Sequence, residues 1–164
     1  MRQPHHAAPD SAEPRILPLP TAGIAVRGLL DESVAAATTR NPAAGSVSVA
    51  IDASPGMRVL GDAGALRGLV ERLVADALAA AAMRSCGDGP SLHEVVITVI
   101  ETPDAVELEI ADSGPSASEH DRCPPSVRDL ATRCGCRLHV TGCPEGGTAV
   151  TVRLPRREVR RQAA

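Results

Sequence analysis

The sequence contains no phenylalanine, tyrosine or tryptophan in 164 residues. A hydrophobic core must therefore be built from aliphatic side chains, and aromatic stacking on bases or sugars is excluded. Lysine is absent as well, so all 17 basic side chains are arginine. Together with a formal net charge of -3 at pH 7, these absences argue against a nucleic-acid-binding protein.

Long hydrophobic runs are also missing. No uninterrupted apolar stretch approaches the roughly 18 residues that a membrane-spanning helix needs, and no apolar signal segment stands at the start. The five cysteines are an odd number without the C-x₂-C spacing of structural zinc sites, which favours small buried thiols. We therefore expect a soluble, cytoplasmic protein that is not inserted in a membrane.

Length and composition divide the chain into one domain and two tails. Its 164 residues are enough for a single core. Residues 1–21 are rich in proline and poor in core-forming side chains, which predicts a disordered arm. Residues 156–164 are basic and are expected to form a frayed tail, which leaves residues 22–155 as the folded domain.

The strongest periodic pattern predicts a long helix around residues 66–81. Its leucines, valines and alanines repeat at helical spacing, and Asp62 precedes it as a natural N-cap. Asp76 is unusual in a helix interior, because its short side chain competes for nearby backbone groups. Arg72 and Asp76 fall together on the flank of the apolar stripe, so we expect them to face a cleft.

Alternating apolar residues indicate several strands around the helical patterns. Strands are expected at 46–51, 57–60, 93–101, 105–112, 136–142 and 147–155. Further helices are expected within 22–38, after a short extended entry, and at 127–133, whereas the polar stretch 113–126 is expected to be irregular. This order predicts a two-layer α/β sandwich of the α+β kind, with about three helices covering one face of a mixed, mostly antiparallel sheet.

Three segments resemble parts of the histidine-kinase-type (GHKL) ATPases, and above all the catalytic ATP-binding domain of two-component sensor kinases. GDAGALRGLVERLVADALAAA (61–81) resembles the helix that opens the nucleotide site, and IADSGPS (110–116) resembles the D-x-G loop. CGCRLHVTGCPEGGTAVTVRLP (134–155) resembles the closing hairpin with its G-T step. The resemblance covers about residues 22–155 and implies the Bergerat ATP-binding fold, with ATP and Mg²⁺ as ligands.

Asp112 stands at the end of a predicted strand. A buried carboxylate at that place can accept hydrogens from the amino group of adenine, and Gly114 lets the backbone turn tightly beside the base. The alternative is that DSG is only a strand-ending turn. The resemblance implies that Gly147 shapes the pocket and that the hydroxyl of Thr148 supports Asp112.

The resemblance to the histidine-kinase-type ATPases implies a role for Asp76. At its position this family normally carries an asparagine that helps to hold Mg²⁺. A carboxylate is also a suitable ligand for this cation. The alternative is an i, i+4 ion pair between Arg72 and Asp76, which contributes only about 0.2–0.5 kcal/mol. Asp76 is thus the candidate metal residue, with the ion pair as the competing interpretation.

The chain departs from the family where phosphate would be held. The family's lid contains a G-x-G-L step whose backbone amides cradle phosphate at a helix start. HDRCPPSVRDLA (120–131) has no glycine and two prolines, which lack amide donors. Arg122 or Arg128 is a candidate for the missing positive charge.

The leading hypothesis is an ATP-binding, histidine-kinase-like ATPase domain in two-component or related signalling, with a degenerate lid. No catalytic residue is assigned. If the protein is an active kinase, it would transfer phosphate to a histidine on a separate chain, such as a phosphotransfer or dimerisation domain, with a response regulator as another candidate partner. The alternatives are a non-catalytic, pseudokinase-like interaction module and an anti-sigma-type serine kinase.

Overall fold

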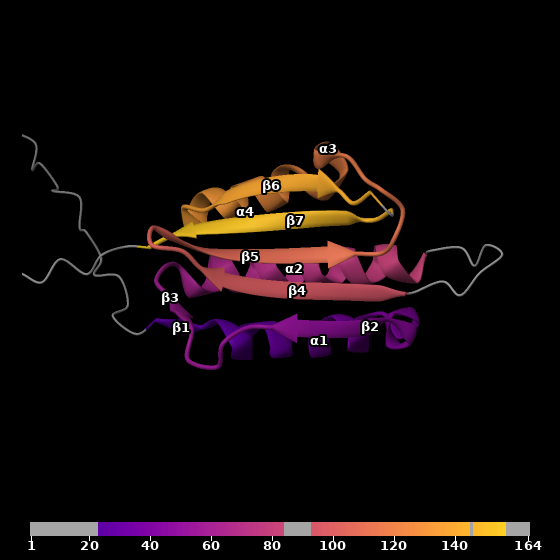
Figure 1. Cartoon of the computed structure of the whole chain (residues 1–164), viewed down its shortest axis with the longest axis horizontal. Helices are drawn as coiled ribbons and strands as arrows, with labels where there is room; N and C mark the ends of the chain where they lie inside the picture. Colours follow the sequence, from indigo (N-terminus) through magenta and orange to yellow (C-terminus); the bar gives the residue numbers. More distant parts are fainter. Residues whose placement is uncertain (1–22, 84–92, 145, 157–164) are drawn as a thin grey trace, which may run out of the picture.

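The computed structural model describes residues 23–83, 93–144 and 146–156, so the predicted arm at 1–21 and most of the predicted tail lie outside the described residues. One layer is a five-stranded sheet. In spatial order its strands are β2 (Ser48–Asp52), β4 (Glu94–Glu101), β5 (Ala105–Asp112), β7 (Thr148–Pro155) and β6 (Arg137–Gly142) (Figure 1).

The sheet is mixed and mostly antiparallel, as predicted. β2 and β4 run parallel, whereas the pairs β4–β5, β5–β7 and β6–β7 are antiparallel. The expected strand at 57–60 forms only as β3 (Arg58–Val59), and it pairs with β1 (Ile24–Ala25) in a separate two-stranded ribbon. This pairing joins residues far apart in sequence, so local alternation alone could not assign it to a sheet.

Three helices cover one face of the sheet: α1 (Val26–Arg40), α2 (Ala63–Ala82) and α4 (Pro125–Cys134) (Figure 1). The predicted cap is confirmed, because Asp62 Oδ1 accepts a hydrogen bond of 2.9 Å from the backbone N–H of Ala65. None of the helices in the described part of the chain has both the length and the apolar character needed to cross a bilayer.

The stretch expected to be irregular contains a short helix, α3 (Glu119–Arg122). A capping box forms it: the hydroxyl of Ser118 accepts from the backbone N–H of Asp121, while the carboxylate of Asp121 accepts from the backbone N–H of Ser118. A further 3₁₀ turn, η1 (Pro42–Ser46), follows α1.

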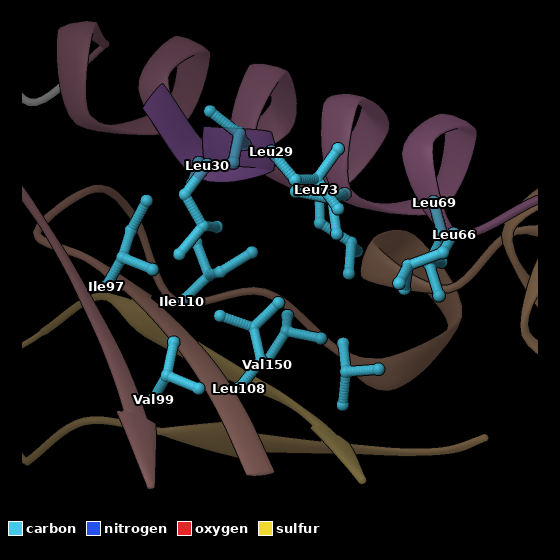
Figure 2. Packing of buried hydrophobic residues seen from close by; sticks show 14 of the residues in the cluster. Leu29, Leu30, Leu66, Leu69, Leu73, Ile97, Val99, Leu108, Ile110 and Val150 are labelled. Atoms are coloured by element: carbon cyan, nitrogen blue, oxygen red, sulfur yellow. The ribbon is translucent and has the colours of Figure 1, made fainter. Parts of the chain in front are cut away.

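The core lies between the two layers and is mostly aliphatic, with Met57, Cys123 and Cys134 among its members. Leu69, Val70 and Val74 of α2 are completely buried. Figure 2 shows Leu69 and Leu73 of α2 facing the sheet, from which Ile97 and Ile110 point toward the helices. The helical and strand periodicities both place their apolar residues on this shared face. As a consequence, the end of β5 lies against the second half of α2, where the candidate site is found.

Candidate functional site

Asp112, the last residue of β5, has a side chain that is only 2% exposed. Its Oδ1 accepts a hydrogen bond of 2.8 Å from the backbone N–H of Gly114, and its Oδ2 lies 2.6 Å from Nη2 of Arg122. Burial raises the pKa of Asp112, and the charge of Arg122 and the backbone N–H groups of Gly114 and Thr148 oppose this rise. The strand-end carboxylate therefore already has partners within its own chain.

Arg122, at the end of α3, is the partner that the sequence did not predict. Its side chain is 9% exposed, and its Nη1 donates a hydrogen bond of 3.2 Å to the backbone carbonyl of Asp76 in α2. Its Nε is buried and has no hydrogen-bond partner within the described residues. The guanidinium thus links β5 to α2. Arg122 is a candidate phosphate contact, but in this structure it binds Asp112, at the end of the site predicted to hold adenine.

Thr148 lies directly opposite Asp112 in the pairing of β5 with β7 and is completely buried. Its hydroxyl accepts a hydrogen bond of 3.0 Å from the backbone N–H of Ala117. Beside it, the hydroxyl of Ser116 donates to the carbonyl of Gly147 at 3.3 Å. Thr148 therefore lies beside Asp112, but its hydroxyl bonds to the segment that precedes α3.

Gly114 and Gly147 are required by close backbone packing. A Cβ at Gly114 would lie 2.4 Å from the carbonyl oxygen of Ala80 in α2. Gly147 has φ +96°, and a Cβ there would lie 1.9 Å from the backbone oxygen of Asp112. Both glycines therefore shape the surroundings of Asp112, and no larger residue fits without moving the backbone.

A cleft of about 320 Å³ lies beside this arrangement, between α2 and the segment that leads into α3. It is lined by Arg72, Asp76, Ala79, Ala80, Met83, Pro115, Ser116, Ala117, Asp121 and Arg122. This volume is at the lower end of the roughly 300–1,000 Å³ typical of ligand pockets. The lining confirms that Arg72 and Asp76 face a cleft.

Asp76 is held less firmly than Asp112. Its side chain is 29% exposed, and its Oδ2 lies 2.8 Å from Nε of Arg72. This is the ion pair expected from the sequence. Within the described ranges no cluster of three or more histidine, cysteine or acidic residues could hold a metal ion. Asp76 is one of two carboxylates in the cleft lining, the other being that of Asp121, and a carboxylate oxygen is a suitable ligand for a hard cation.

The predicted residues are close together, but they do not all reach the cleft. Asp112, Gly114, Gly147 and Thr148 are absent from its lining, whereas Arg122 is part of it. The guanidinium therefore stands between the carboxylate and the open space. The sequence could not predict this contact, because Arg122 lies in a polar stretch without periodicity and reaches Asp112 only when that stretch folds back.

Arg128, the second candidate phosphate contact, points elsewhere. Its Nε donates a hydrogen bond of 2.8 Å to the carbonyl of Cys123, and its side chain is 54% exposed.

Cys123 and Cys134 are buried, which confirms the expectation of core thiols for these two. Burial also raises the pKa of Cys136 to about 12, so this thiol stays protonated at neutral pH.

No family model and no curated protein matches this sequence. Solved structures nevertheless share its fold. The nucleotide-free catalytic domain of histidine kinase ThkA gives a TM-score of 0.66 at 13% identity, over 82% of this chain and 95% of that one. The ATP-binding domain of PrrB from Mycobacterium tuberculosis gives 0.64 at 22% identity, over 83% and 97%.

The mycobacterial sensor histidine kinase MprB gives a TM-score of 0.62 at 19% identity, over 82% of this chain and 97% of that one. The chain therefore has the fold of the catalytic, ATP-binding domains of sensor histidine kinases. This confirms the resemblance identified from the three sequence segments. Identities this low establish the fold, so the function must be argued from the site itself.

Proposed function

We propose that this chain binds ATP as a histidine-kinase-like domain in two-component or related signal transduction in the cytoplasm. The observation that carries the proposal is the buried carboxylate of Asp112 at the end of β5. A buried carboxylate needs hydrogen-bond donors, and the exocyclic amino group of adenine is one. Guanine has a carbonyl oxygen in the equivalent position, so the site would select ATP over GTP.

The remaining residues have supporting roles in this proposal. Gly114 and Gly147 keep side chains away from the base, and Thr148 supports Asp112 from the adjacent strand. Asp76 holds Mg²⁺ against the phosphates, since it lines the cleft and offers a carboxylate oxygen. The metal would neutralise phosphate charge, which is otherwise unfavourable beside an aspartate.

Phosphoryl transfer depends mainly on positioning and charge neutralisation. The stretch 120–131 supplies no glycine-rich amide cradle, and the start of α4 has Pro124 as its N-cap and Pro125 as its first residue. We therefore assign no catalytic residue. If transfer occurs, the acceptor is a histidine of a separate phosphotransfer or dimerisation domain. A response regulator is the other candidate partner.

A second candidate function is that of a non-catalytic, pseudokinase-like interaction module. The contact between Arg122 and Asp112 favours it, because the carboxylate is satisfied without any nucleotide. In that case the fold would serve only to present a surface to a signalling partner.

Binding of a fluorescent ATP analogue, measured with and without Mg²⁺, tests the proposal. Asp112→Asn should abolish binding, because the amide would present a donor or a weaker acceptor to the adenine amino group. Asp104→Asn is the matched control, since Asp104 is exposed and pairs with Arg153 at the far end of β5. Binding that survives Asp112→Asn would contradict the role given to this carboxylate.

A further inference from the structure

Residues 115–123, here called the strap, connect β5 to α4 and can be followed in Figure 1 from the end of β5 through α3. We propose that the strap is a built-in competitor of adenine: in the nucleotide-free chain Arg122 occupies the carboxylate that would bind the base. This inference rests on the proposed nucleotide binding. It adds that ATP binds only after the strap has left Asp112.

The first support is the chemistry of the contact. Nη2 of Arg122 presents an N–H donor to Asp112 Oδ2 at 2.6 Å, as the amino group of adenine would. The guanidinium also carries a positive charge, which the adenine amino group lacks. The ion pair adds a Coulomb attraction between two opposite charges to the hydrogen bond, and adenine, which is neutral, cannot replace that attraction.

The second support is that the strap binds more than one of the groups expected to serve the nucleotide. The backbone N–H of Ala117 donates to the hydroxyl of Thr148, and the hydroxyl of Ser116 donates to the carbonyl of Gly147. Arg122 also donates to the carbonyl of Asp76. The three elements α2, β5 and β7 are therefore all bound by one short segment.

The third support is that the strap is anchored at its last residue, Cys123, while the neighbouring Arg122 is incompletely satisfied. Cys123 is 2% exposed and packs into the core, which holds the strap close to the site. The buried Nε of Arg122 lacks a partner among the described residues, and an unpaired buried donor lowers the stability of the docked state. The cleft next to Arg122 gives the strap an open side toward which it can move.

ATP affinity of matched variants tests this proposal. Arg122→Ala should bind ATP at least about tenfold more tightly than the unaltered chain. In the unaltered chain ATP binds only the fraction of molecules in which Arg122 has left Asp112, whereas in the variant Asp112 is always free. Arg153→Ala is the control: it removes an arginine near the far end of β7, which pairs with Asp104 and Glu107 outside the strap and whose side chain is 46% exposed. Its affinity should equal that of the unaltered chain, and Arg122→Ala/Asp112→Asn should lose the gain.

The outcomes separate the two proposals. Equal, measurable affinities of Arg122→Ala and the unaltered chain would overturn the strap but leave nucleotide binding intact. No binding by any variant at millimolar ATP, with folded protein confirmed by circular dichroism, would overturn both. If Arg122→Ala does not fold, Arg122→Gln replaces it, since glutamine lacks the charge but keeps part of the stem.

Hydrogen exchange gives an independent measurement on the unaltered chain. A ligand usually protects the segment that contacts it, but saturating ATP should here speed the exchange of the Ala117 amide, which is bonded to Thr148 in the docked strap. Slower exchange across 115–123 on addition of ATP would overturn the proposal, because the strap would then close over the nucleotide rather than leave.

Discussion

Asp112 and Asp76 are both expected to contact nucleotide, yet the protein holds them in opposite ways. Asp112 is 2% exposed and is bound by a backbone amide and a buried arginine. Asp76 is 29% exposed and has an ion pair with Arg72, one helical turn away. Asp112 is thus part of the fold, whereas Asp76 is available to a ligand at little structural cost.

The largest expected effect is on the backbone around Asp112. Gly147→Ala places a Cβ 1.9 Å from the backbone oxygen of Asp112 at a residue with φ +96°. Backbone strain and overpacking together should lower the free energy of unfolding by roughly 2–6 kcal/mol. Urea denaturation measures this. Gly142→Ala is the control, because a Cβ there meets no atom within 4 Å, and equal stability of the two variants would contradict the prediction.

The next effect concerns the ion pair itself. Arg122→Ala leaves the carboxylate of Asp112 buried without its charged partner, and loss of one partner of a buried pair costs about 3–5 kcal/mol. Urea denaturation at pH 7 checks this value. The double variant Arg122→Ala/Asp112→Asn should be more stable than the sum of the two single changes predicts, and strict additivity would show that the two side chains are not coupled.

The destabilisation of Arg122→Ala should depend on pH. Burial raises the folded-state pKa of Asp112 above its ordinary 3.8, and removal of the guanidinium removes an opposing influence. Between the unfolded and the folded pKa the native chain binds more protons, so its stability falls as pH rises through that window. The deficit should therefore be largest near pH 7 and shrink as the pH is lowered toward the ordinary pKa of 3.8, and a deficit that stays constant from pH 7 down to about pH 4 would argue against this origin.

The smallest expected effect is at Asp76. Asp76→Ala removes only an i, i+4 pair on α2, so the free energy of unfolding should change by about 0.2–0.5 kcal/mol. Arg72→Ala is the matched control, since it breaks the same pair and keeps the carboxylate. If Asp76 holds the metal, only Asp76→Ala should lose the Mg²⁺-dependent part of ATP binding in the titration. Equal Mg²⁺ dependence in both variants would leave the ion pair as its sole role.

The elements with strong local signals could be predicted. The stripe of apolar residues in α2, its cap at Asp62 and the hairpin of β4 and β5 depend on periodicity and on near neighbours in the sequence. α3 was not predicted, because its capping box lies in a polar stretch whose other residues favour a loop. The separate pairing of β1 with β3 was not predicted either, since it depends on the position of α1.

The candidate site divides along the same line. Strand alternation and helical spacing are properties of the chain alone, and they sufficed to predict that Asp112 ends a strand and that Asp76 lies on the flank of an apolar helix. The group that meets Asp112 depends instead on how distant parts of the chain fold together. Arg122 is ten residues further along the chain, and its guanidinium reaches the carboxylate only when the strap folds back against α2 and β7. Burial then makes that contact strong, because the interior screens charges less than water does.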